Sequence, residues 1–295
     1  MSTSPRPDQF YLFRPPFRLL VPLRGPRFLD ASHGREGAAL VWCMGTDSSP
    51  ELVRDLRLRP GGIALVGVLP RAEEVARPQD LFEFVDQCRP HSLLPHHELP
   101  NPLDLRTLLA ETPGDLPGAV VDYLAWRGLV LDLGLRRTIR RVLELSAELR
   151  TVTGVARSLF MSRRALGRRF MKEGLPVPSH WLQFGRVLRA ALRLQRPEST
   201  LVGVAFDLGY SDGFSLSNQM KRLLGVRPNH ASTRLGWEWA VECWIQQEIE
   251  EGGFSPALAR ALSRRDGPTG TDGAEDGSGP ADDSRERAQR REKRA

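Results

Sequence analysis

The sequence predicts a mainly α-helical protein in which a small α/β domain precedes a helical domain containing a repeated pair of helices. Three observations predict this fold class. Short apolar runs alternate with helical patterns over the first third of the chain, the pattern is helical from Leu116 onward, and one helix pair occurs twice between Thr151 and Gly225. With 295 residues, of which 40% are hydrophobic and 26% charged, the chain has room for about two domains.

Residues 1–30 are rich in Pro, Arg and Phe without a sustained period, which indicates an irregular arm. The small α/β domain is expected over residues 31–115, because apolar runs alternate there with helical segments. Its expected strands span residues 38–45, 63–69 and 92–94, and its expected helices span residues 50–58, 79–87 and 103–110. This alternation predicts a parallel sheet. In size and order the domain loosely resembles a shortened receiver domain of a response regulator, so a degenerate receiver is one interpretation.

The remaining chain divides into three segments by composition and period. Residues 116–135 are expected to form a helical connector, and residues 136–252 a helical domain. Residues 253–295 are predicted to be a disordered tail, because from Gly267 onward no apolar residue is larger than Ala and no core can form.

The basic charge is concentrated in one block of domain size. Residues 136–234 hold 19 Lys/Arg and 6 Asp/Glu, a net charge of +13, whereas residues 1–135 carry −3 and residues 235–295 carry −4. A local excess of this size indicates a polyanionic partner, and nucleic acid is the commonest one. A solvated basic surface is the alternative that charge alone leaves open.

Several classes of protein are excluded or not expected. No apolar run approaches the roughly 20 residues of a membrane-spanning helix, and the N-terminus lacks the apolar core of a secretory signal. The cysteines, Cys43, Cys88 and Cys243, are few, odd in number and widely spaced, which argues against a disulfide framework. We therefore expect a cytoplasmic protein without membrane contact.

The repeated helix pair predicts two helix-turn-helix units. Each first helix carries apolar residues at i, i+3, i+4 and i+7, and Thr151 and Thr200 precede the two copies as N-caps. These apolar positions are Val152, Val155, Ala156 and Leu159 in the first copy and Leu201, Val204, Ala205 and Leu208 in the second. A break and a second helix with a polar outer face follow in both copies, which is the pattern of a helix-turn-helix.

The outer faces of the second helices supply the residue types that read DNA. Arginine makes bidentate contacts to guanine, asparagine makes them to adenine, and lysine and serine hold phosphates. The candidate DNA-binding residues are Arg163, Arg164 and Arg168 in the first unit and Ser215, Ser217, Asn218 and Lys221 in the second. For any one of them alone, a solvated helix face is the better interpretation. Seven such residues on two equivalent helices of a basic domain favour DNA.

A single long helix is predicted between the two units. Residues 178–195 read as one helix of about 27 Å at 1.5 Å per residue, with Pro178 in its first turn. A stiff spacer of this length is able to hold two recognition helices about one DNA turn, roughly 34 Å, apart. The two helices would then enter successive major grooves on one face of the duplex.

Residues 136 to about 234 resemble the DNA-binding domain of the AraC/XylS family of bacterial transcription regulators. The resemblance lies in VARSLFMSRRALGRRFMKEG, in WLQFGRVLRAA and in VAFDLGYSDGFSLSNQMKRLLGVRP. It implies seven helices with two helix-turn-helix units, and a regulator, activator or repressor, that binds double-stranded promoter DNA. The sequence departs from the family pattern at Gly167, Asn218 and Ala231, and the segment from Gly174 to Pro178 is one residue longer. RNA polymerase and a second copy of the chain, held through the α/β domain, are further candidate partners.

Other parts of the sequence offer weaker candidate sites. The run from His91 to Glu98, with His96 and His97, holds possible metal ligands, but it contains prolines and reads as a loop. Lysine is absent before residue 172, so receiver-type phosphoryl switching is not expected. No catalytic residue, cofactor or metal site is predicted. Two alternatives stay open: a thiol- or ligand-sensing module or enzyme, with Cys43 as the thiol, that the helical domain only targets to DNA, and an interaction scaffold that has lost DNA binding.

Overall fold

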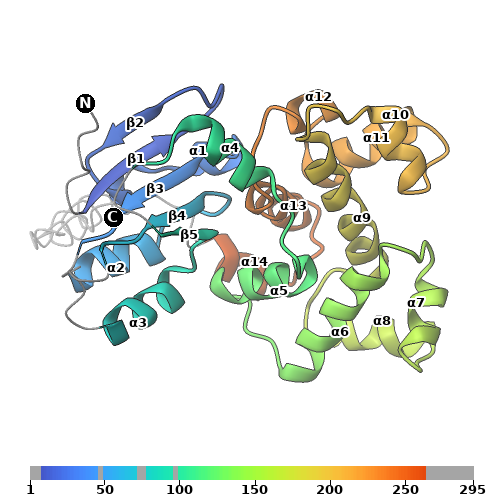
Figure 1. The fold of residues 1–295 in the computed structure, drawn as a ribbon. Coiled ribbons are helices and arrows are strands. Elements are labelled where there is room, and N and C mark those ends of the chain that lie inside the picture. Colours follow the sequence, from blue (N-terminus) through green and yellow to red (C-terminus); the bar gives the residue numbers. More distant parts are fainter. Residues whose placement is uncertain (1–7, 46–48, 72–77, 96–98, 264–295) are drawn as a thin grey trace, which may run out of the picture.

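The computed structural model describes residues 8–45, 49–71, 78–95 and 99–263. A five-stranded sheet with its covering helices forms one half of this part of the chain, and helices form the other half (Figure 1). The strands are β1 (Gln9–Phe13), β2 (Leu20–Leu23), β3 (Ala39–Cys43), β4 (Ala64–Val68) and β5 (Ser92–Leu94). The predicted fold class, mainly α with a small N-terminal α/β domain, is confirmed.

The sheet has the order β2-β1-β3-β4-β5. Strands β3, β4 and β5 are parallel, as predicted, but β1 pairs antiparallel with both β2 and β3. The expectation of an irregular arm over residues 1–30 is therefore wrong for the two strands β1 and β2. Alternation explains them, because Phe10 and Leu12 pack on one face of the sheet and Phe13 on the other. The prolines around this short run conceal its period.

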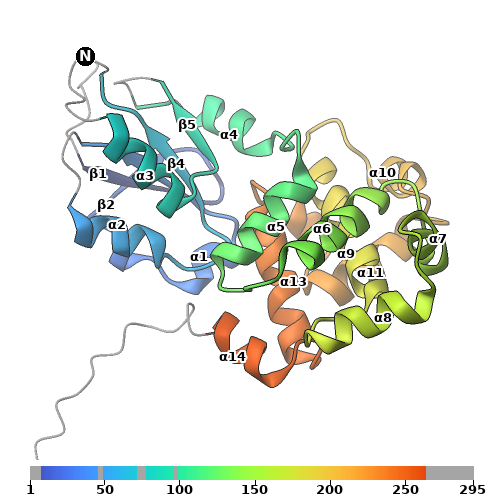
Figure 2. The ribbon, with the colours of Figure 1, turned by 90° about the horizontal axis from the view of Figure 1, so that it is seen from below.

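Helices cover both faces of the sheet. Helices α2 (Pro50–Arg57) and α3 (Pro78–Cys88) lie on the face that carries Leu40 and Trp42. Helix α4 (Pro102–Ala110) buries Leu105 and Leu109 against the opposite face, beside Val41. Figure 2 shows the same arrangement from below. The short helices η1 (Pro26–Phe28) and α1 (Ala31–Arg35) connect β2 to β3.

The helical half begins with α5 (Leu116–Trp126) and contains the seven helices that the resemblance implies for residues 136–234. These seven are α6 (Leu133–Leu145), α7 (Val152–Ser158), α8 (Arg163–Lys172), α9 (Pro178–Leu194), α10 (Leu201–Asp207), α11 (Gly213–Leu224) and α12 (Pro228–Ala231). Helices α13 (Glu238–Glu250) and α14 (Pro256–Ser263) follow. The prediction of disorder from residue 253 is wrong as far as Ser263, because Phe254 and Leu262 are buried in the helical core.

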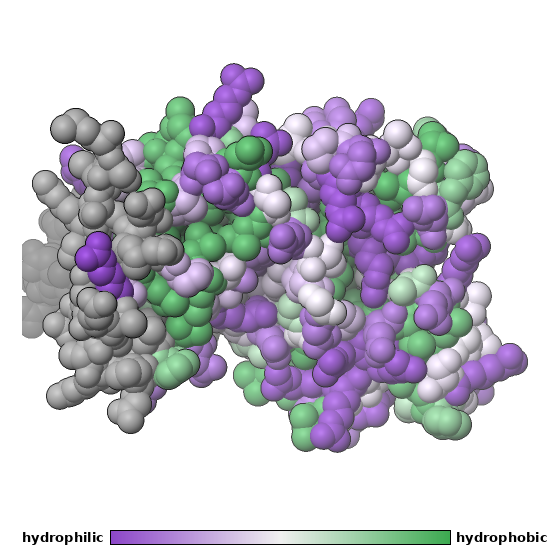
Figure 3. Space-filling view, in the orientation of Figure 1, coloured by the Kyte–Doolittle hydropathy of each residue, from purple (hydrophilic) through white to green (hydrophobic). Residues whose placement is uncertain are grey.

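The two halves differ in surface character. In the view of Figure 3, polar residues cover much of the helical half, with apolar patches between them, and apolar residues gather over the sheet half. This division agrees with the concentration of basic residues in the helical domain. A charged partner is therefore expected to bind the helical half.

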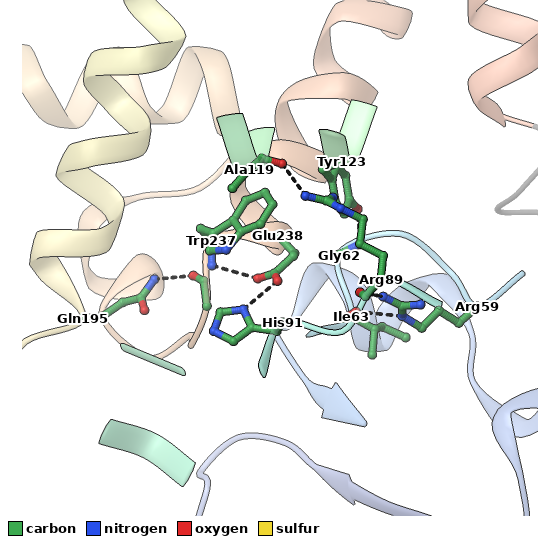
Figure 4. A network of polar contacts seen from close by, with 11 residues as sticks. Arg59, Gly62, Ile63, Arg89, His91, Ala119, Tyr123, Gln195, Trp237 and Glu238 are labelled. Atoms are coloured by element: carbon green, nitrogen blue, oxygen red, sulfur yellow. Dashed lines mark hydrogen bonds and ion pairs between the residues drawn. The ribbon is translucent and has the colours of Figure 1, made fainter. Parts of the chain in front are cut away.

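A buried polar network joins the two domains around α13 (Figure 4). The Nδ1 atom of His91 lies 2.7 Å from Oε1 of Glu238 at the start of α13, and both side chains are almost fully buried. The backbone N–H of Gly62 donates to the hydroxyl oxygen of Tyr123 at 2.7 Å. Arg89 donates to the carbonyl oxygen of Ala119 at 2.6 Å and lies over the ring of Tyr123. Loops at the edge of the sheet are thereby fixed to α5 and α13.

A buried ion pair continues this network inside the helical half. Arg127 donates to both carboxylate oxygens of Glu242 at 2.8 Å, and the Tyr123 hydroxyl donates to the same carboxylate at 2.9 Å. Gly61 lies against this pair, since a Cβ atom there would stand 2.1 Å from Oε2 of Glu242. Burial raises the pKa of Tyr123 well above its usual value, so the phenol stays a donor. The α/β domain is therefore packed directly onto the ion pair.

Candidate nucleic-acid interface

The two helix-turn-helix units begin in the same way. The side chain of Thr151 accepts from the backbone N–H of Gly154, and that of Thr200 accepts from Gly203, both at 3.1 Å. Each second helix is capped too: Ser162 accepts from Ala165 at 3.1 Å and Asp212 from Ser215 at 2.7 Å. The contacts of Thr151 and Thr200 confirm the two predicted N-caps, and all four caps satisfy backbone donors that have no partner within a helix. The caps fix where α8 and α11 begin.

The turns between the paired helices adopt the same left-handed conformation. Gly209 has φ +71° in the second unit, and Phe160 has φ +53° at the corresponding place in the first. Glycine takes this conformation without a steric penalty, whereas a residue with a side chain is strained by about 1–2 kcal/mol. Phe160 gains no packing in return, because its side chain is 99% exposed.

The second helix of each unit buries one face and exposes the other. Leu166 and Phe170 of α8 are completely buried, and Leu216 and Met220 of α11 occupy the same positions in their unit. Because these residues point into the core, the opposite faces of α8 and α11 point outward. The buried residues therefore determine which side chains of α8 and α11 are exposed to a partner.

All three predicted residues of the first unit lie on the exposed surface of α8. Arg163, Arg164 and Arg168 are exposed, and the structure shows no hydrogen bond or ion pair between them and any other described residue. Helix α8 itself contains no acidic residue. Three guanidinium groups on about two turns of helix form a strongly cationic surface suited to phosphates and guanine.

The predicted residues of the second unit are less uniform. Asn218 is exposed and makes no hydrogen bond to a described residue, while Ser217 is half-buried. Lys221 is exposed but donates to the carbonyl oxygen of Gly225 at 2.9 Å. Ser215 is half-buried, and its hydroxyl lies 2.9 Å from that of Ser211. Asn218 is therefore the most available of the four to a base.

Sequence reasoning missed Phe214, which the structure places on this outer face with 75% of its surface exposed. The signal was present in the spacing, because residues 214, 217, 218 and 221 follow the helical pattern i, i+3, i+4 and i+7. Its apolar residue type, which is usually buried, distinguished it from the polar residues at the other three positions.

Helix α9 is the spacer between the two units. It runs for 17 residues, about 25 Å, and its apolar face is buried. Arg186 donates to the carbonyl oxygen of Leu208 at 2.8 Å and lies 4.3 Å from the centre of the Tyr210 ring. On the next turn Arg189 donates to the carbonyl oxygen of Leu143 at 2.9 Å. The spacer is therefore fastened both to the second turn and to α6.

The alternative sites gain no support from the geometry. Burial raises the pKa of the Cys43 thiol to about 11, so this group is not an activated nucleophile. His91 is committed to Glu238, and His96, His97 and Glu98 lie outside the described residues. Within the described part of the chain, no group of three or more His, Cys, Asp or Glu residues is placed to hold a metal ion.

Comparison with known proteins assigns the helical half. Residues 155–234 match the family model described as a helix-turn-helix domain. No curated protein and no solved structure matches the chain. The protein is a DNA-binding transcription regulator of the helix-turn-helix class, and residues 155–234 form a DNA-binding domain of the AraC/XylS type. None of the described helices has the length and apolar character that a membrane span requires.

Proposed function

We propose that this regulator binds double-stranded DNA sequence-specifically by placing α8 and α11 in two adjacent major grooves. One observation carries the proposal: the two units share caps, turns and buried positions, and both are packed on the single helix α9. Because the two units are built in the same way, α8 and α11 present corresponding faces to solvent. A 17-residue spacer matches the scale of one turn of DNA, about 34 Å.

Binding would begin with electrostatic attraction to the phosphates and end with contacts to the bases. The +13 charge of residues 136–234 attracts the phosphate backbone, which supplies affinity and sets the position of the protein. Arg164 and Arg168 would contact guanine and Asn218 would contact adenine, with each good bidentate contact contributing about 1–3 kcal/mol of discrimination. No catalytic step or cofactor is part of this proposal. The proposal also includes that the protein acts in the cytoplasm, where it meets both DNA and RNA polymerase.

The proposal is tested by selecting bound DNA from a random duplex library with the full chain. Hydroxyl-radical footprints on the selected DNA should show two protected patches about one turn apart on one face. Arg168→Ala should weaken one patch and Asn218→Ala the other. Arg106→Ala, an exposed arginine on α4, should change neither and serves as the matched control.

Two results would contradict the proposal. The first is a footprint with a single patch, or with patches on opposite faces of the duplex. The second is binding whose strength does not fall with added salt, because a protein that neutralises phosphates must release counterions. Loss of an activity on Cys43→Ser, with DNA binding intact, would instead support the thiol-based alternative.

A further inference from the structure

Phe214 is an exposed aromatic residue on a helix face that is otherwise polar. It is the second residue of α11, and 75% of its surface is in contact with solvent. Its neighbours along the face, Ser217, Asn218 and Lys221, are polar residues that the sequence predicts to bind DNA. The Phe214 side chain does not contribute to the core, because the buried residues of this helix include Leu216 and Met220.

The internal repeat assigns Phe214 a counterpart in the first unit. Counted from the N-caps Ser162 and Asp212, the second residue of α8 is Arg164 and the second residue of α11 is Phe214. In helix-turn-helix proteins the first residues of the recognition helix are the ones that contact base edges. The same position therefore presents a guanidinium group in one unit and an apolar ring in the other.

These two groups select different bases. A guanidinium group pairs with O6 and N7 of guanine, whereas an apolar side chain in the major groove contacts the 5-methyl group of thymine. Asn218, one turn further along α11, is suited to adenine. The chemistry of the first unit thus points to guanine, and that of the second unit to an A·T-containing step.

We propose that Phe214 is a specificity-determining residue that contacts a thymine methyl group, so that the two half-sites differ in base composition. The first half-site contains guanine read by α8, and the second contains thymine and adenine read by α11. This inference rests on the proposed function, because it requires α11 to lie in the major groove.

A protein partner is the other class of molecule that an exposed phenylalanine could contact. Val202 and Phe206 on α10 are 55% and 62% exposed, and Figure 3 shows apolar surface over this unit. However, α10 is the first helix of its unit, which crosses the DNA backbone rather than entering the groove. The position of Phe214 in line with Ser217, Asn218 and Lys221 favours the base contact, and Phe206 provides a matched control.

The test uses the full chain and the duplex selected from a random library. Each thymine of the second half-site is replaced in turn by deoxyuridine, which lacks only the methyl group. One replacement should weaken binding by the wild-type chain about four-fold, the effect of withdrawing one methyl group from an apolar contact. The same replacement should have no effect on Phe214→Ser and a reduced effect on Phe214→Leu. Phe206→Ser should keep the full wild-type response, and thermal melting should show that all three variants are folded.

The outcomes separate the inference from the proposed function. If the wild-type chain enriches a bipartite sequence but no deoxyuridine weakens it, or if Phe214→Ser keeps the methyl dependence, the assignment of Phe214 is wrong and two-groove binding stands. If Phe206→Ser loses the dependence on the thymine methyl group as Phe214→Ser does, the effect is not specific to the Phe214 position and the assignment is overturned as well. If no DNA is enriched, both proposals fail together.

Discussion

Arg127 provides the most direct test of the buried ion pair onto which the α/β domain packs. Its side chain is fully buried and donates to both oxygens of Glu242 and to the carbonyl oxygen of Leu262. Arg127→Met keeps most of the volume but leaves the carboxylate of Glu242 buried without its cation. Removing one partner of a buried ion pair costs about 3–5 kcal/mol, which lowers the melting temperature by roughly 10 °C for a chain of this size.

Thermal melting of the full chain measures this effect. Arg136→Met is the control, because Arg136 and Asp122 form an ion pair at 2.9 Å whose side chains are 39% and 60% exposed. Exposed pairs contribute less than about 1 kcal/mol. The double variant Arg127→Met with Glu242→Met should recover most of the loss, since no buried charge remains. A decrease for Arg127→Met no larger than that of the control would refute the reasoning.

Three further predictions concern the contact between the two domains, the turn of the first helix-turn-helix unit and the spacer helix α9. Burial opposes the charged form of His91, but Glu238 outweighs it and raises the pKa of His91, so the pair stabilises most fully below about pH 6.5. That stabilisation is lost as the pH rises through the raised pKa, and the melting-temperature difference between wild type and His91→Gln should shrink accordingly. Phe160→Gly should raise stability by about 0.5–1 kcal/mol, measured by denaturant unfolding, because it relieves a left-handed conformation; a loss would contradict this. Arg186→Ala removes a donor to Leu208, and hydrogen exchange should accelerate in α10 and α11 but not in α7 and α8.

The helix-turn-helix units were predictable because their signals are local. The spacing of Val155 and Val204 with their neighbours identifies one helix face, and Thr151 and Thr200 mark where the helices begin. Each feature depends on residues within about two helical turns of one another. The net charge of +13 on residues 136–234 then indicated nucleic acid as the partner.

The parts that escaped prediction depend on distant contacts or on an assumption about burial. The strands around Phe10 are short and flanked by prolines, so their alternation is hard to distinguish from an irregular segment. The pair formed by Arg127 and Glu242 spans 115 residues, and no periodic pattern encodes it. Phe214 lies at helical spacing from Ser217, Asn218 and Lys221, and only its residue type, which is usually buried, distinguished it from them.

The unlike outer faces of α8 and α11 have a consequence for orientation. A regulator built from two identical heads related by a two-fold axis sits on a palindrome and cannot distinguish its left side from its right. Here the two heads follow one another in a single chain, and the arginines of α8 are not repeated on α11. If α8 and α11 read adjacent major grooves as proposed, the duplex is read with a polarity, and the sheet-bearing domain would lie toward one defined end of the site at each location that the protein occupies.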